Sequence, residues 1–217
     1  RLFVKNYLAR SVSVFDTLDL THGISNSAAL IREIPTVQSE KLAPAVLRGK
    51  RTFYDASNPR MSRDGYLSCA VCHLDGGHDG QVWDFTQRGE GLRNTISLLG
   101  KAGMGQGRLH WTANFDELQD FENEIRDEFG GRGFLTDEDF LAGRTDPLGV
   151  PKAGLSAELD DLAAYMTSLT VPPRSPHRQA DGTLSDDAAL GRRVFSALNC
   201  QRCHSGSGFS DGLRHDV

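Results

Sequence analysis

The sequence predicts a mainly α-helical protein with a short β segment at its N-terminus. Three observations support this fold class. Apolar residues recur at helical spacing in several stretches, alternation of apolar and polar residues is confined to the first twenty residues, and one cysteine and histidine motif occurs twice. A chain of 217 residues is also long enough to bury a hydrophobic core.

Residues 1–20 predict a pair of β-strands, because Val12 and Val14 alternate with Ser11 and Ser13. Two strands alone are marginally stable in water. We therefore expect this pair either to pack on the helical body or to be the end of a larger sheet.

Four helices are predicted further along the chain, at residues 44–54, 114–129 and 156–169, with a fourth beginning at Ser185. Pro44 suits a first helical turn, and Asn114 is a suitable cap with Glu117 three residues later. The acidic outer face of the helix at 114–129 is interpreted as solvated.

An internal repeat links the two halves of the chain. Gly49 and Phe53 stand four residues apart before the first cysteine motif, as Gly191 and Phe195 do before the second. Fifteen residues separate Phe53 from Cys69 and only four separate Phe195 from Cys200, which a loop insertion explains. A glycine at this place allows two helices to approach closely. The sequence therefore predicts a duplicated helical unit.

The repeated motif is Cys-x-x-Cys-His, formed by Cys69, Cys72 and His73 and again by Cys200, Cys203 and His204. Cysteines three apart on a helical turn face the same way, so both thiols reach the two vinyl groups of one porphyrin. The adjoining histidine supplies a nitrogen to the iron. The motifs predict two covalently bound haem c groups and hence two cytochrome c-like haem domains.

A Cys-x-x-Cys pair is also typical of zinc sites, so a zinc-binding structural or partner-docking module built on the two pairs is the alternative function. Covalent haem attachment implies a periplasmic or otherwise exported protein. The predicted organisation is a β-strand remnant and linker at 1–39, a first haem domain at 40–170, a linker at 171–183, and the start of a second haem domain at 184–217.

Further segments resemble a known family. Arg93-Asn94-Thr95, and Leu109-His110-Trp111 leading into an acidic helix, resemble the di-haem cytochrome c peroxidase and MauG family. The stretches LRGKRTFYDAS and GRLHWTANFDELQDFENEIR look like a branch in which such modules follow a YVTN-type β-propeller. The resemblance covers about residues 40–217, and residues 1–17 are similar to the last strands of such a propeller.

The resemblance implies a periplasmic di-haem c-type cytochrome that transfers electrons, with peroxidase-like reduction of hydrogen peroxide at the first haem. It implies an oxidoreductase whose donor or acceptor is a small redox protein, a cytochrome or a cupredoxin. The family's catalytic glutamate position falls at Asp120, with Glu122 as the alternative. Asn94 matches a position that binds calcium between the two domains.

The axial ligands follow in part from the motifs. His73 and His204 are the expected proximal ligands of the two irons. Met104 and His110 are the leading candidate distal ligands of the first iron, because both thioether and imidazole ligate haem. His78 ranks behind them because it lies only five residues from His73, and an open site is the remaining alternative. For the second iron His215 is the candidate, and its other interpretation is a surface residue.

Composition excludes two classes of function. A formal net charge of −5 provides no basic surface for nucleic acid, and no apolar run approaches the roughly 18 residues of a transmembrane helix. The chain begins without Met and ends 13 residues after His204. We therefore expect a fragment in which the second haem domain is truncated.

Overall fold

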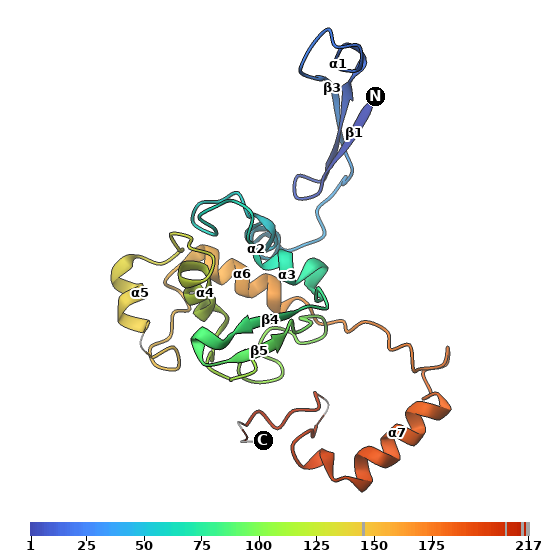
Figure 1. Ribbon diagram of the computed structural model, residues 1–217, viewed down its shortest axis with the longest axis vertical. Helices are drawn as coiled ribbons and strands as arrows, with labels where there is room; N and C mark the ends of the chain where they lie inside the picture. Colours follow the sequence, from blue (N-terminus) through green and yellow to red (C-terminus); the bar gives the residue numbers. More distant parts are fainter. Residues whose placement is uncertain (145, 207, 214, 216–217) are drawn as a thin grey trace. The chain divides into compact units, whose positions relative to one another are not determined.

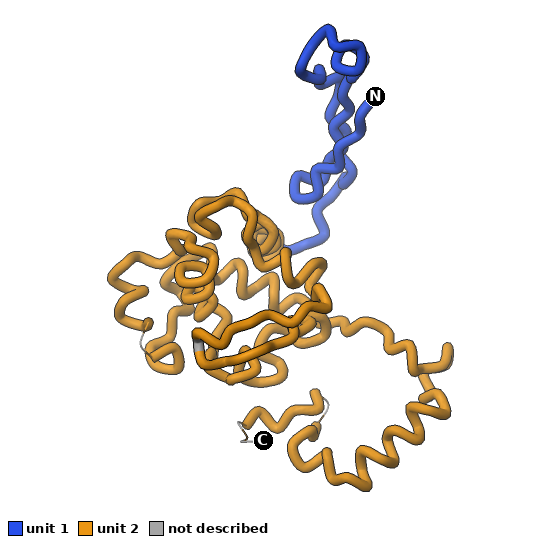
Figure 2. Tube along the Cα trace, viewed as in Figure 1, with its two compact units in different colours: residues 1–43 blue, residues 44–217 orange. Residues whose placement is uncertain are grey.

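The computed structural model describes residues 1–144, 146–206, 208–213 and 215. They form two compact units, Arg1–Ala43 and Pro44–Val217 (Figure 2). About 32% of the residues are helical and 15% lie in strands.

The first unit is a three-stranded antiparallel sheet in the order β1 (Leu2–Asn6), β2 (Ser11–Asp16) and β3 (Ala29–Pro35), followed in Figure 1 from the N-terminus. The predicted strand pair is present as β1 and β2. The third strand lies where a linker was expected. The register shifts opposite Val14 and Phe15, and such a bulge breaks the alternation by which a strand is recognised in sequence. A single turn, α1 (Leu18–Thr21), connects β2 to β3.

Two crossing helices form the centre of the second unit, α2 (Pro44–Tyr54) and α6 (Ala157–Thr167). The predicted positions of both helices are confirmed, and Ser156 caps α6 through its side chain. A Cβ atom on Gly49 would lie only 1.7 Å from the carbonyl oxygen of Asp161, so the close approach expected of this glycine is confirmed. Arg48 ties the helices together by donating to both carboxylate oxygens of Asp161, at 2.6 and 2.8 Å.

Shorter elements accompany this helix pair: α3 (Cys69–Cys72), η1 (Leu74–Gly76), β4 (Val82–Phe85), η2 (Thr86–Arg88), β5 (Gly91–Asn94), η3 (Leu118–Phe121), α4 (Glu122–Asp127) and α5 (Asp137–Gly143). Helix α7 (Asp186–Ala197) and η4 (Cys200–Arg202) follow α6 in the chain. Strands β4 and β5 pair antiparallel as a small hairpin (Figure 1). The second unit is therefore built from short helices and turns around one crossing pair.

The core of the second unit consists of two adjoining apolar clusters. The first contains the buried residues Phe53, Ala70, Leu118, Leu162, Tyr165 and Met166. The second contains Met61, Ile125, Phe134, Leu135, Phe140 and Leu159. Cys69 contacts both clusters, which places the first cysteine motif at their junction.

The helix predicted at residues 114–129 begins later than expected. Its first turn is η3, and Glu117 rather than Asn114 caps it in a capping box with Asp120. The side chain of Asn114 instead contacts His110. Two acidic residues expected on a solvated face, Asp120 and Glu122, are fully buried. The interpretation of that face was wrong for these two residues because their carboxylates bond to neighbouring loops.

The predicted fold class, mainly α with two cytochrome c-like haem domains, is wrong. The described residues combine two separate sheets with short helices, and among them the second copy of the repeat forms no buried cluster. Helix α7 starts at the predicted Ser185 cap, yet it contains no buried residue, and a Cβ on Gly191 would meet no atom within 4 Å. Among the described residues, no helix combines the length and apolar character needed to cross a membrane.

Candidate functional site

The first cysteine motif lies on the single turn of α3. The amide of His73 donates to the carbonyl of Cys69 at 2.9 Å, which closes the turn immediately after Cys72. Because both cysteines lie on one helical turn, their side chains leave it on the same side. Both cysteines are free, and both residues are partly buried. The turn therefore presents two thiols to one ligand.

The imidazole of His73 is oriented by the backbone that follows the motif. Its Nδ1 lies 3.3 Å from the carbonyl oxygen of Gly77. When Nδ1 donates to a carbonyl, Nε2 carries the lone pair and is the nitrogen that binds a metal. Burial lowers the pKa of His73, partly offset by the Gly77 and Ile96 backbone, so the ring favours the neutral, metal-binding form.

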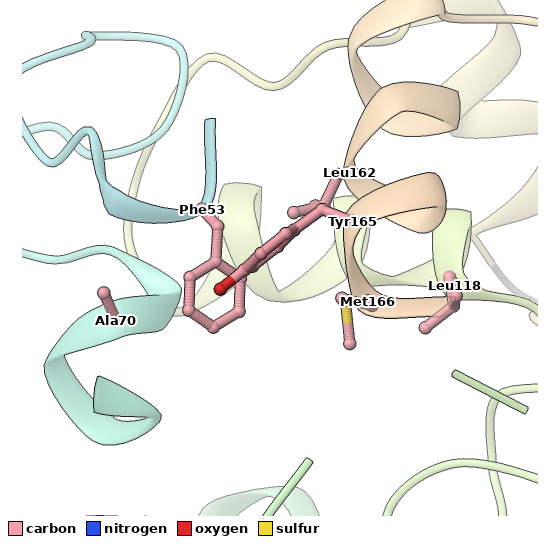
Figure 3. Close-up of a cluster of buried hydrophobic side chains, with 6 residues drawn as sticks. All are labelled: Phe53, Ala70, Leu118, Leu162, Tyr165 and Met166. Atoms are coloured by element: carbon pink, nitrogen blue, oxygen red, sulfur yellow. The ribbon is translucent and has the colours of Figure 1, made fainter. Parts of the chain in front are cut away.

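The sulfur of Cys69 lies in apolar surroundings. Figure 3 shows the cluster beside it, with the ring of Phe53 between Ala70 of α3 and Tyr165 of α6. The Phe53 and Tyr165 rings meet edge to face with centroids 5.1 Å apart. Burial raises the pKa of the Cys69 thiol to about 12, so this site disfavours a charged thiolate. An uncharged thioether suits it better than a zinc thiolate.

His110 is held by contacts on two sides. Its Nδ1 is 2.8 Å from the side-chain oxygen of Asn114, and its ring packs 4.4 Å from Phe115 and 5.2 Å from Phe121. The backbone of His110 has φ of +63°, which is uncommon outside glycine and costs of order 1 kcal/mol. The ring is therefore held in place at a strained position.

The other candidate ligands have different surroundings. Met104 packs as a partly buried side chain against the first apolar cluster. Asn94 ends β5, and its backbone carbonyl accepts a hydrogen bond from the Trp111 indole at 2.9 Å. A calcium-binding role for Asn94 stays a prediction.

Asp120, one of the two expected catalytic residues, belongs to a buried network. Its carboxylate accepts from Lys152 Nζ at 2.6 Å and from the amides of Asp116 and Glu117 at 3.1 and 3.2 Å. Glu117 in turn accepts from the Lys152 amide, which fastens the loop before α6 to η3. Sequence reasoning missed Lys152 because a lysine in a loop is usually solvated.

Glu122, the alternative catalytic residue, is equally buried and fully engaged. Its carboxylate accepts from the amides of Phe134 and Leu135 at 2.8 and 3.0 Å and from Arg126 Nε at 2.8 Å. Arg126 also donates to the carbonyl of Leu135 and to Asp137. The carboxylates of Asp120 and Glu122 thus hold neighbouring loops together. A catalytic role for either residue stays a prediction.

The second motif lies at the end of α7 in more exposed surroundings. Cys200 and Cys203 are partly exposed, and His204 is exposed. His204 Nδ1 lies 3.2 Å from the carbonyl of Phe209, which matches the contact of His73 in the first motif. Cys203 lies within 4.8 Å of the side-chain donors of Asp211 and His215, so His215 is brought to the motif through Cys203. Among the described residues no cluster unites the four cysteines.

The described residues thus define a mixed α and β chain that carries one Cys-x-x-Cys-His turn on an apolar core and a second at its exposed end. The chain is 30% identical over 182 residues to hydrazine synthase subunit gamma of Kuenenia stuttgartiensis, which covers 78% of this chain and 46% of that protein. The structure of Kuenenia stuttgartiensis hydrazine synthase pressurized with xenon matches with a TM-score of 0.50 and 28% identity, over 82% of this chain and 55% of that chain. No family model matches.

These similarities correct the expected assignment. Both relatives are hydrazine synthase, so the resemblance to the di-haem cytochrome c peroxidase and MauG family was wrong, as was the expected di-haem electron-transfer or peroxidase function. They do not favour the zinc or docking module either. The chain is related to an oxidoreductase enzyme, and it spans about half the length of the relatives that it matches.

Proposed function

We propose that this chain is the haem-bearing part of a subunit of an oxidoreductase that resembles hydrazine synthase, with one haem c attached at Cys69 and Cys72. The observation that carries the proposal is the geometry of the first motif. One helical turn at the junction of two apolar clusters presents two thiols, and His73 follows with Nδ1 directed at a backbone carbonyl. The similarity to hydrazine synthase subunit gamma supplies the class of enzyme.

The residues present suit a haem. The macrocycle is largely apolar, and Phe53, Leu98, Leu109 and Met166 belong to the cluster beside Cys69. Thioether bonds leave no charge on sulfur, which agrees with the raised pKa of Cys69. His73 would bind the iron through Nε2. A bound haem would supply redox chemistry at its iron.

Of the two leading candidate ligands we assign His110 rather than Met104. The ring of His110 is fixed by Asn114, Phe115 and Phe121, whereas Met104 packs as a partly buried side chain against the first apolar cluster. A fixed imidazole would either bind the haem iron or hold a proton beside it. Phe115 and Phe121 pack against the His110 imidazole and shield one side of it from water.

The haem part of the proposal is tested by counting covalent haem on the full chain, made in a bacterial periplasm with haem-attachment enzymes. Intact-protein mass spectrometry is expected to show one haem, lost in Cys69→Ala/Cys72→Ala. The matched control is Cys200→Ala/Cys203→Ala, which is expected to keep it. Haem that persists without Cys69 and Cys72 contradicts the assignment.

The role of His110 is tested on the same protein by the optical spectrum of the reduced haem with and without carbon monoxide. If His110 binds iron, His110→Ala is expected to convert a low-spin spectrum into one that responds fully to carbon monoxide. If His110 only holds a proton, the parent responds already and the variant shifts the pH dependence of carbon monoxide binding. An effect of Met104→Ala in place of His110→Ala contradicts the assignment.

The enzyme part is tested in the whole protein to which this chain belongs. Hydrazine formation by the purified, intact protein is expected to fall at least about 100-fold in His73→Ala, because the haem iron would then lack the ligand that His73 is proposed to supply. His204→Ala is the matched control in the second motif. Unchanged hydrazine formation in His73→Ala contradicts the proposal. A periplasmic location and a small redox protein as electron donor belong to the same proposal.

A further inference from the structure

Lys152 is a buried charge to which the proposed chemistry gives no role. Its side chain is only 2% exposed, and its Nζ donates at 2.6 Å to Oδ1 of Asp120, a fully buried carboxylate. Removing both charges from water is costly, so a buried ion pair is weak evidence of a purely stabilising role. A Cβ atom on Gly143 would lie 2.9 Å from Cε and 3.3 Å from Nζ of this lysine. The lysine thus occupies a space that a glycine keeps open.

The second oxygen of Asp120 closes the turn that begins η3. Oδ2 accepts from the amides of Asp116 and Glu117 at 3.1 and 3.2 Å. Glu117 in turn accepts from the amide of Lys152, so hydrogen bonds join the turn and the loop before α6 in both directions. Leu118, on the same turn, belongs to the first apolar cluster (Figure 3). The turn is therefore anchored to the core on which the first cysteine motif lies.

The side chains that frame His110 flank the segment closed by Asp120. The rings of Phe115 and Phe121 pack against the His110 imidazole with centroids 4.4 and 5.2 Å away, and against each other at 5.4 Å. The Phe115 carbonyl also accepts at 2.9 Å from the amide of Leu109, the residue before His110. A displacement of the Asp120 carboxylate would therefore move both rings and the backbone that carries His110.

The orientation of the His110 ring decides which of its nitrogens carries the proton. Nδ1 lies 2.8 Å from the side-chain oxygen of Asn114, an atom that only accepts, so Nδ1 donates and Nε2 carries the lone pair. Binding iron and accepting a proton both need that lone pair. A ring that turned away from Asn114 would exchange between its two tautomers. The contacts that hold the ring are thus as important as the imidazole itself.

We propose that Lys152 is a positioning residue that acts through Asp120 to hold the His110 ring with its proton on Nδ1. The inference rests on the proposed function, which assigns His110 to the haem. The ammonium keeps the buried carboxylate charged, and a charged carboxylate is the stronger acceptor for the two amides of the turn. Without the cation, the carboxylate takes up a proton from solvent or moves toward water, and its hold on both amides weakens. Phe115 and Phe121 then lose their fixed positions around the ring.

The tautomer of His110 is measured by nitrogen-15 NMR on the full chain labelled in histidine. The sample is reduced under saturating carbon monoxide, which makes any haem iron diamagnetic and displaces an imidazole from it. His110→Ala identifies the resonances. The parent is expected to show the tautomer with the proton on Nδ1. In Lys152→Met the ratio of this tautomer to the other is expected to fall at least about 5-fold, the weight of one net hydrogen bond.

Two further variants separate positioning from a general loss of stability. Arg48→Met removes the cation from another carboxylate, that of Asp161, away from the turn, and is expected to keep the parent ratio. Gly143→Ala displaces only the flexible end of Lys152 and should lower the ratio as Lys152→Met does. It decides the question if Lys152→Met does not fold.

Three results overturn the proposal: a parent that already shows both tautomers, a parent ratio retained when Lys152 is removed or displaced, and an equal loss in Arg48→Met. The measurement reads the His110 ring and not the number of haems attached to the chain. Failure of the haem assignment and failure of the role of Lys152 are therefore distinguishable.

Discussion

The two Cys-x-x-Cys-His motifs share their residues and a local contact but differ in their surroundings. In both, Nδ1 of the histidine lies against a downstream carbonyl, at 3.3 Å from Gly77 and 3.2 Å from Phe209. The first motif lies where two buried clusters meet, whereas the helix before the second buries nothing. A motif thus specifies the local turn, whereas the packing around the described residues differs between the two copies.

The largest expected difference concerns the repeated phenylalanine. Phe53 is fully buried and Phe195 only partly, although both stand four residues after a glycine. Phe53→Ala is expected to lower the free energy of unfolding by about 3 to 5 kcal/mol, through lost transfer energy and a cavity. Phe195→Ala is expected to change it by less than about 1 kcal/mol. Urea denaturation followed by circular dichroism measures both, and equal losses would refute the contrast.

Buried and exposed ion pairs give the next contrast. Lys152→Met leaves the buried carboxylate of Asp120 without its cation, which costs about 3 kcal/mol, at the low end for such pairs because two backbone amides still donate to it. His215→Ala removes the partner of Asp211 at the exposed end and is expected to cost less than about 1 kcal/mol. The same denaturation experiment compares them. A loss below about 1 kcal/mol in Lys152→Met would show that Asp120 is satisfied without it.

The repeated glycines should respond in opposite directions. Gly49→Ala places a methyl group against the backbone of Asp161, and we expect a loss of about 2 kcal/mol as the two helices separate. Gly191→Ala meets open space within α7, where alanine favours the helix by about 0.5 to 1 kcal/mol. The helicity of α7, followed by amide hydrogen exchange, should therefore rise. Destabilisation by Gly191→Ala would mean that this glycine has a close neighbour.

The sequence predicted local structure well and tertiary surroundings poorly. Capping serines and Pro44 located the starts of α2, α6 and α7, because a cap needs only a few neighbouring residues. The bulge in the first sheet concealed β3. The second copy of the glycine and phenylalanine repeat predicted a packed half that the described residues do not form.

In the candidate site, too, the sequence predicted the local motifs but not the contacts between distant residues. The residues of both motifs were found from their spacing, since the chemistry needs those residue types side by side. His110 was one of the open candidates, and the contacts of its ring with Asn114, Phe115 and Phe121 became visible only in the structure. Lys152 carried no signal, because its role depends on a carboxylate 32 residues away. Cys203, Asp211 and His215 likewise come together through a loop whose path the sequence did not reveal.

Lowering the pH should have a different effect on the stability of the core around the first motif and on the loop after the second motif, and this difference is the smallest of those predicted. Burial raises the pKa of Glu158, but its own backbone amide and the guanidinium of Arg60, 2.5 Å away, outweigh this and hold the pKa below the ordinary value of 4.5. Because the folded-state pKa is the lower one, this stabilisation is complete above about pH 4.5 and is lost as the pH falls through the folded-state pKa. The pair is partly exposed, so its contribution stays below about 1 kcal/mol.

Glu158→Gln is therefore expected to flatten part of the fall in unfolding free energy between about pH 5 and pH 3. Asp211 is the matched case in the second region, where the Leu213 amide and His215 hold its pKa below 3.8. Its protonation should loosen only the loop after the second motif, because no buried cluster of the described chain includes that loop. Asp211→Asn should leave the pH dependence of global unfolding unchanged. If Asp211→Asn flattened that dependence as much as Glu158→Gln, the exposed end would be part of the cooperative fold, and the contrast between the motifs would fail.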